Sequence, residues 1–165
     1  MISLNLLISM IALLMTLVSS KMNYELHTSW DVNFEDYFIE NLQKAKKSID
    51  GFVYKFKSDT IYNVLEEKGK DGVNFRLICD INEAWSNDQY CQKFAKYGEV
   101  VPFKSKDFDK LHAKGILIDK QLLLIGSSNL DNNSITDNME ILAAINDTKM
   151  ASTFENIFNM VFDEM

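Results

Sequence analysis

Residues 111–129 read LHAKGILIDKQLLLIGSSN, two apolar runs of strand length joined by a short polar turn at Lys120-Gln121. Apolar runs without strict alternation are typical of strands that a sheet buries on both faces. The stretch therefore predicts a pair of neighbouring strands within a buried sheet.

The rest of the chain alternates between helices and strands. In the helical stretches apolar residues recur at steps of three and four, and Ser86 with Gln89 adds a capping box to one of them. We expect helices at about 33–48, 61–69, 86–98 and from 148 onward, and strands at about 51–56, 73–79, 100–103, 111–119, 122–125 and 139–145. This alternation predicts an α/β fold, with a mixed β-sheet sandwiched by helices.

The composition of the chain indicates one folded domain. Its 165 residues are 47% hydrophobic and 25% charged, which is an ordinary mixture for a globular domain of this size. A single Pro and the lack of low-complexity sequence exclude a disordered, collagen-like or repeat protein. The net charge of -7 argues against a general binder of nucleic acid, because phosphate binding usually leaves a basic footprint.

The N-terminus forms a separate apolar segment. Residues 2–18 read ISLNLLISMIALLMTLV and carry no charge. The small residues after them suit a signal-peptide cleavage site, although no cation precedes the run, and its length is at the lower limit for a membrane anchor. We expect an N-terminal apolar helix in residues 1–21, acting as a signal peptide or membrane anchor, and a domain at 22–165. The protein is then membrane-associated, or secreted or periplasmic if residues 1–20 are removed; Lys21 slightly favours an anchor with a cytosolic domain.

Cys79 and Cys91 are the only two cysteines, too few for a disulfide framework or a four-cysteine zinc site. The sequence leaves open whether they pair or stay as free thiols. It contains no HxxEH, no CxxC and no row of aspartates, so we expect no metal and no cofactor.

Polar side chains with a shared chemistry lie in and after the strand pair. Strand alternation places His112 and Lys114 on one face, and the following GSSN loop can bring Ser127 and Asn129 to the same place. Lysine supplies a positive charge, asparagine an NH2 donor, and histidine a nucleophile or acid, so this set suits an oxyanion. Glu140 can orient the imidazole by accepting a hydrogen bond from one ring nitrogen.

The spacing HxKx4Dx6GSxN resembles the motif of the phospholipase D superfamily. The chain matches it without a gap, and the downstream Asn-x-Glu also resembles the family. The matching positions are His112, Lys114, Asp119, Gly126, Ser127 and Asn129, followed by Asn138 and Glu140. The resemblance covers about residues 30–165 and points to the short single-motif branch, which holds a bacterial periplasmic endonuclease and the Zucchini-type mitochondrial cardiolipin hydrolases.

This resemblance implies a phospholipase D-like fold and a phosphodiesterase that needs no metal. In the family one histidine attacks phosphorus to form a phosphohistidine, and a second protonates the leaving oxygen and then activates water. The implied roles are catalysis for His112, Lys114 and Glu140, phosphate binding for Lys114, Ser127 and Asn129, and a motif or structural role for Asp119, Gly126 and Asn138.

The reaction needs two histidines at one site, whereas the chain has one motif. The other histidine, His27, is followed by Thr28 and Ser29, so we expect it on the surface or in packing. We therefore predict a C2 homodimer that places two copies of His112 about one axis.

The sequence leaves the substrate open between anionic phosphodiesters. The apolar N-terminus and acidic charge favour a phospholipid such as cardiolipin, with membrane contact through residues 2–18 and the mitochondrial outer membrane as one candidate location. The small architecture and two lysine clusters favour an endonuclease on single-stranded DNA or RNA. The third hypothesis is a catalytically silent membrane-anchored binding module, against which the intact motif argues. The clusters are Lys104, Lys106, Lys110, Lys114 and Lys120, and Lys44, Lys46, Lys47, Lys55 and Lys57.

Overall fold

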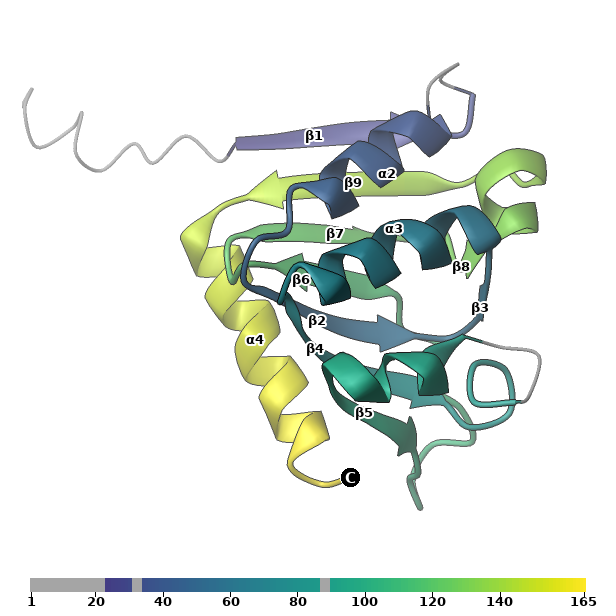
Figure 1. Cartoon of the computed structure of the whole chain (residues 1–165), viewed down its shortest axis with the longest axis vertical. Coiled ribbons are helices and arrows are strands. Elements are labelled where there is room, and N and C mark those ends of the chain that lie inside the picture. The colour runs from purple at the N-terminus through teal and green to yellow at the C-terminus, as the bar shows by residue number, and fades with distance from the viewer. Residues whose placement is uncertain (1–22, 31–33, 87–89) are drawn as a thin grey trace, which may run out of the picture.

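The computed structural model describes residues 23–30, 34–86 and 90–165, which build a seven-stranded mixed sheet in the order β1-β9-β7-β6-β2-β4-β5 (Figure 1). β2, β4 and β5 run parallel to one another, and the remaining neighbours pair antiparallel. The short strands β3 and β8 pair separately. The strands are β1 (Asn23–Thr28), β2 (Ser48–Val53), β3 (Phe56–Lys57), β4 (Asn74–Asp80), β5 (Gly98–Phe103), β6 (Gly115–Ile118), β7 (Leu122–Gly126), β8 (Leu130–Asp131) and β9 (Ile141–Asn146).

Helices cover both faces of this sheet, which confirms the predicted α/β class (Figure 1). Two helices and a 3-10 segment pack on one face, in a core that contains Phe38 and Phe94, and a C-terminal helix packs on the other face through Phe154 and Phe158. The helical elements are α2 (Phe34–Gln43), α3 (Asp59–Lys70), the 3-10 helix η1 (Cys91–Tyr97), the π-helical turn η2 (Asn133–Asp137) and α4 (Thr148–Phe162).

The predicted N-terminal apolar helix falls on residues 1–21, which lie outside the described residues. Within the ranges that the structure describes, no helix is long and apolar enough to cross a membrane.

The strand pair that the sequence predicts at 111–125 is present, but its first strand is shorter than expected. β6 begins only at Gly115, because the amide of Leu111 donates to the carboxylate of Asp80 at 2.9 Å instead of to a neighbouring strand. His112 and Lys114 therefore lie in the segment that leads into β6, not in the strand itself. The turn after β6 has positive φ at Asp119 and Lys120, 53° and 58°, as a tight hairpin of this type requires.

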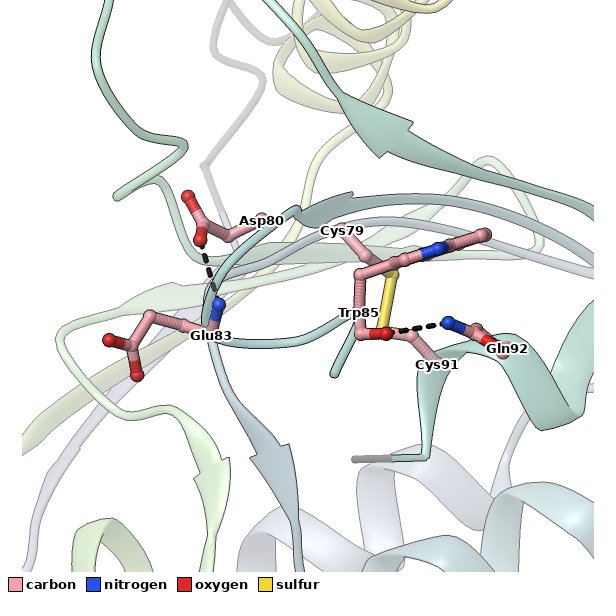
Figure 2. The surroundings of a disulfide bond; sticks show 6 residues. All are labelled: Cys79, Asp80, Glu83, Trp85, Cys91 and Gln92. Carbon is pink, nitrogen blue, oxygen red and sulfur yellow. Dashed lines mark hydrogen bonds between the residues drawn. A yellow bond between two sulfur atoms is a disulfide. The ribbon is translucent and has the colours of Figure 1, made fainter. Parts of the chain in front are cut away.

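The predicted helix at 86–98 is wrong in its described part, since residues 91–97 form the 3-10 helix η1. Two tertiary contacts override the helical sequence pattern there. Cys91 forms a disulfide with Cys79 of β4 (Figure 2). The Phe94 ring stacks on Phe56, with ring centroids 5.6 Å apart. The disulfide also answers the cysteine question that the sequence leaves open.

The first helix ends at Gln43, about one turn earlier than predicted, and β2 begins at Ser48. The cause is the carboxylate of Asp119, which accepts backbone N–H groups from Lys46, Lys47 and Ser48 and so draws this segment into the sheet.

One edge strand, β1, is absent from the sequence prediction. It pairs antiparallel with β9 over six residues, with His27 opposite Leu142. Its alternation of Tyr24 and Leu26 with Glu25 and His27 is a strand pattern, but it is too short to stand out.

Candidate active site

The candidate site lies at one edge of the sheet, where two strands end and two begin. The antiparallel registers place the ends of β2 and β7 beside the starts of β6 and β9. The polar residues next to these four strand ends are Tyr54, Lys114, Ser127, Asn129 and Glu140. The sheet therefore brings together residues up to 86 positions apart in the chain (140 − 54).

His112 and Lys114 both contact one aromatic ring, that of Tyr54. The imidazole of His112 is exposed and packs edge-on against Tyr54, with ring centroids 4.5 Å apart. The Lys114 ammonium lies 4.8 Å from the centroid of the same ring and donates to the backbone carbonyl of His112 at 2.8 Å. Sequence reasoning missed Tyr54, because the strand predicted at 51–56 includes this residue, whereas β2 ends at Val53.

The charges around His112 favour its neutral form. The ammonium of Lys114 lowers the pKa of His112, burial and Lys110 act in the same direction, and Asp80 opposes them. Because the ordinary pKa of histidine is about 6.5, the lowered value makes the neutral ring the major form at pH 7. A neutral imidazole has the free lone pair that a nucleophile needs.

Lys114 is partly buried, and its surroundings combine opposing effects. Burial lowers the pKa of Lys114, while the carboxylates of Glu140 and Asp131 raise it. Two acidic side chains are thus close enough to act on this ammonium, and Glu140 is one that the sequence motif identifies.

Glu140 is nearly buried and belongs to a hydrogen-bonded cluster with other motif residues. Its carboxylate accepts from the hydroxyl of Ser127 and from the amide of Asn138, the latter at 3.4 Å. Ser29, directly after β1, accepts from the Glu140 backbone N–H and donates to the Asn138 carbonyl, both at 2.6 Å. The predicted contact of Glu140 with the His112 imidazole is not among these bonds and stays a prediction, as does the phosphate contact of Ser127.

A small cavity of about 20 Å³ opens at this edge and is lined by Tyr54, Lys114, Gly126 and Asn129, among others. The amide nitrogen of Asn129 donates to Ser134 at 3.2 Å, which leaves its second N–H for a ligand. Gly126 lets the end of β7 lie close to β9, because a Cβ at this position would lie 2.0 Å from the carbonyl oxygen of Ile141.

Asp119 lies at the far end of β6, away from His112 and Lys114. Its carboxylate accepts the N–H groups of Lys46, Lys47 and Ser48 at 2.7 to 3.2 Å. The aspartate of the motif thus anchors the start of β2, which is a structural role.

The second histidine packs as predicted. His27 of β1 lies against the Tyr37 ring of α2, with centroids 3.9 Å apart. Across the described ranges no group of three His, Cys, Asp or Glu side chains could hold a metal ion. That the reaction needs no metal remains a prediction.

The predicted lysine cluster at 44–57 is split between the two ends of β2. Lys46 and Lys47 precede the strand, beside Asp119, whereas Lys55 and Lys57 follow it. Lys55 lines the cavity and also a neighbouring polar groove, which it shares with Lys57 and Tyr90. The cations near the candidate site are therefore Lys55, Lys57, Lys110 and Lys114.

Comparison with known proteins finds one matching family model and several relatives of related description. The family model described as cardiolipin synthase, PLD-like domain, matches residues 38–162. The chain is similar to the mitochondrial cardiolipin hydrolase of Chlamydomonas reinhardtii, with 30% identity over 126 residues, 76% of this chain and 56% of that protein. It is also similar to the mitochondrial cardiolipin hydrolase of Mus musculus, with 25% identity over 76% of this chain and 57% of that protein. The chain thus spans a little over half the length of these curated relatives.

Solved structures share the fold. Nuc, a phospholipase D family member from Salmonella typhimurium, superposes with a TM-score of 0.75 and 21% identity over 87% of this chain and 95% of that chain. NucT from Helicobacter pylori gives 0.76 and 18% over 87% and 97%. Because the family model spans most of the chain and the site residues lie together at the sheet edge, the chain belongs to the phospholipase D superfamily, among relatives of Nuc-type and cardiolipin hydrolase type.

Proposed function

We propose that this protein is a phosphodiesterase of the phospholipase D type, which cleaves through a phosphohistidine on His112 at a site shared by two subunits. The observation that carries the proposal is the meeting of a neutral, exposed His112 with the Lys114 ammonium over Tyr54, beside a cavity that Asn129 lines. A nucleophile and two donors for a phosphoryl oxygen thus lie at one sheet edge.

The first step joins nitrogen to phosphorus. The unprotonated ring nitrogen of His112 attacks, the bond from phosphorus to the leaving oxygen breaks, and protonated His112 of the partner subunit gives that oxygen its proton. Lys114 and Asn129 neutralise the charge that develops on the phosphoryl oxygens.

The second step releases the product. The imidazole of the partner's His112, now neutral, takes a proton from water as the water oxygen attacks phosphorus. The nitrogen–phosphorus bond breaks, and His112 returns to its neutral form. Two histidines of opposite protonation state are needed, and His27 packs on Tyr37, so a second copy of the chain supplies the second one.

The first candidate substrate is a phospholipid such as cardiolipin, supported by the similarity to two mitochondrial cardiolipin hydrolases and by the apolar residues 2–18. Single-stranded nucleic acid is the second candidate, supported by Lys55 and Lys57, whose ammonium groups suit phosphates. The groove that they line also carries the carboxylates of Asp59, Glu83 and Asp131, so the support comes from the two lysines and not from the groove as a whole.

The test is to incubate the full chain in mild detergent with cardiolipin vesicles and with labelled single-stranded DNA, beside His112→Ala and His27→Ala. We expect cleavage of one substrate, abolished by His112→Ala and retained by the matched His27→Ala. Release of phosphatidic acid supports the lipid, and salt-sensitive DNA cleavage supports the nucleic acid. Activity on neither substrate would instead favour a silent binding module.

A further inference from the structure

Asp80 is a buried carboxylate that the proposed reaction does not use. It ends β4, and its relative exposure is 0%. One oxygen accepts the backbone N–H of Asn82 at 3.0 Å and that of Glu83 at 2.9 Å, and Figure 2 shows the bond to Glu83. The other oxygen accepts the N–H of Leu111 at 2.9 Å. A carboxylate is costly to bury unless it is hydrogen-bonded, and bonds from N–H groups to an ionised acceptor are among the strongest in proteins.

The third of these bonds reaches the residue next to His112. Residues 111–114 precede β6 and are not part of a strand, so the backbone at His112 lacks the ladder bonds that hold the strand. The parallel register pairs Val53 with Cys79, which places Asp80 in line with Tyr54, the residue whose ring contacts His112. The bond to Leu111 therefore fixes the backbone beside the ring that the imidazole touches.

The loop that Asp80 begins is itself held at several points. The amides of Ala84 and Trp85 donate to the Asp80 carbonyl at 3.0 Å, and the Glu83 carboxylate lies 3.3 Å from the ammonium of Lys55, which lines the cavity. The disulfide from Cys79 begins directly before Asp80 (Figure 2). Contacts of the following loop thus hold Asp80 in place. Its second carboxylate oxygen in turn holds the segment that carries His112.

We propose that Asp80 is a positioning residue, which holds His112 in its reactive place through the Leu111 amide; the proposal rests on the role of His112 as nucleophile. Asp80 touches no reacting atom, so its effect passes through the backbone and through its charge. The charged groups that act on His112 are Lys114 and Lys110, which lower its pKa, and Asp80, which raises it.

The test compares Asp80→Asn with Asp119→Asn. Both remove a carboxylate that accepts backbone N–H groups, but Asp119 does so at the opposite end of β6. An asparagine at position 80 keeps one acceptor oxygen and replaces the other with an NH2 group. That NH2 group would face either the amides of Asn82 and Glu83 or the amide of Leu111, and because these are donors too, the hydrogen bond there is lost. We expect Asp80→Asn to lower kcat by about 10- to 100-fold with KM within about twofold, because a displacement of about 1 Å at a reacting group has effects of this size. Asp119→Asn should leave the kcat of folded protein within about twofold.

A second readout separates positioning from general destabilisation. The chain has two histidines, so an NMR titration resolves His112 with His27 as an internal reference. Removing the Asp80 charge takes away the one effect that raises the pKa of His112, so this pKa should fall in Asp80→Asn. The titration needs no substrate, so it tests Asp80 even if the proposed function fails.

Wild-type kcat and an unchanged His112 titration in folded Asp80→Asn would overturn the proposal. Should this variant not fold, hydrogen exchange on the wild-type chain decides. A Leu111 amide as protected as those of Asn82 and Glu83 supports the anchor, and exchange of Leu111 at the rate of a free amide overturns it.

Discussion

Lys114 has two effects at the scale of the single residue. Its charge is the largest cause of the lowered pKa of His112, and in the proposed reaction its ammonium is also a donor for a phosphoryl oxygen. The ring of Tyr54 lies beside both side chains and so sets how they face one another. The reactivity of the motif histidine thus depends on two neighbours, of which only Lys114 is part of the motif.

Replacing Lys114 by methionine should raise the pKa of His112 toward its ordinary value and lower kcat by about 10²- to 10³-fold, the typical effect of removing one charge-stabilising donor. The acidic limb of the pH–rate profile should move to higher pH with it, because the imidazole stays protonated over a wider range. Histidine NMR and pH–rate profiles measure both effects. Lys110→Met is the matched control, with a smaller shift in the same direction, and an unchanged His112 pKa in Lys114→Met would contradict the assignment.

Substitutions of Tyr54 should separate the aromatic ring from its hydroxyl. Tyr54→Phe keeps the ring that contacts His112 and Lys114, so we expect activity within about twofold of wild type. Tyr54→Leu removes the cation–π contact, which is worth about 0.5–1 kcal/mol at exposed sites, and the edge contact to the imidazole, so kcat should fall about tenfold. Equal activity of the two variants would show that the ring does not position the pair.

At the scale of elements, the strand β2 is joined to β4 and α4 by one buried ion pair. The Asp50 carboxylate of β2 accepts two hydrogen bonds from Arg76 of β4, at 2.8 and 2.6 Å, and Arg76 also donates to Asn159 of α4 at 2.9 Å. The guanidinium lies 5.1 Å from the Phe158 ring centroid. Asp50 is almost fully buried, so the removal of its partner leaves an unpaired charge in the core.

Arg76→Ala should therefore lower the free energy of unfolding by about 3–5 kcal/mol, the usual effect of breaking a buried pair from one side. Urea unfolding followed by circular dichroism measures it. The control is Lys70→Ala, which breaks an exposed pair with Glu66 and should change stability by less than about 0.5 kcal/mol. A similar small effect for both variants would show that Asp50 is tolerated without its partner.

Local patterns predicted the elements that are long and apolar, and failed where distant contacts decide. The central strands and the start of α4 at Thr148, capped by Asp147, follow from the sequence. The early end of α2 depends on Asp119, 76 residues after Gln43 (119 − 43), and the 3-10 form of η1 depends on a disulfide and on the packing of Phe94.

The site shows the same limit. Motif spacing identified His112 and Lys114, but Tyr54, Ser29 and Asp80 reach the site only through the fold, from segments that carry no motif.

At the scale of the whole molecule, each chain supplies one motif histidine. The proposed reaction needs one neutral and one protonated histidine, so the functional unit that we propose is a pair of chains. The pair would also combine the two sets of lysines near the site, which focuses an anionic substrate more strongly than the net charge of -7 suggests.

Mixed dimers test the shared site directly. A heterodimer of wild-type and His112→Ala chains, purified through two different affinity tags, should lose nearly all activity, because one histidine cannot serve as both nucleophile and acid. A wild-type dimer carrying the same tags is the control. About half of the wild-type rate in the heterodimer would show that each chain acts alone.

The disulfide between Cys79 and Cys91 has a practical consequence for how the protein is produced and stored. Such bonds form in oxidising compartments and are removed by glutathione and other cellular thiols, so a preparation from a bacterial cytosol and one from an oxidising secretory route should be two different materials. For a bridge of this span we expect the oxidised form to be more stable by about 3 kcal/mol, with a correspondingly higher Tm. Thiol titration distinguishes the oxidised from the reduced form, and equal Tm values for the two would show that the disulfide does not stabilise the fold. Storage buffers without dithiothreitol would keep the loop beside Asp80 closed.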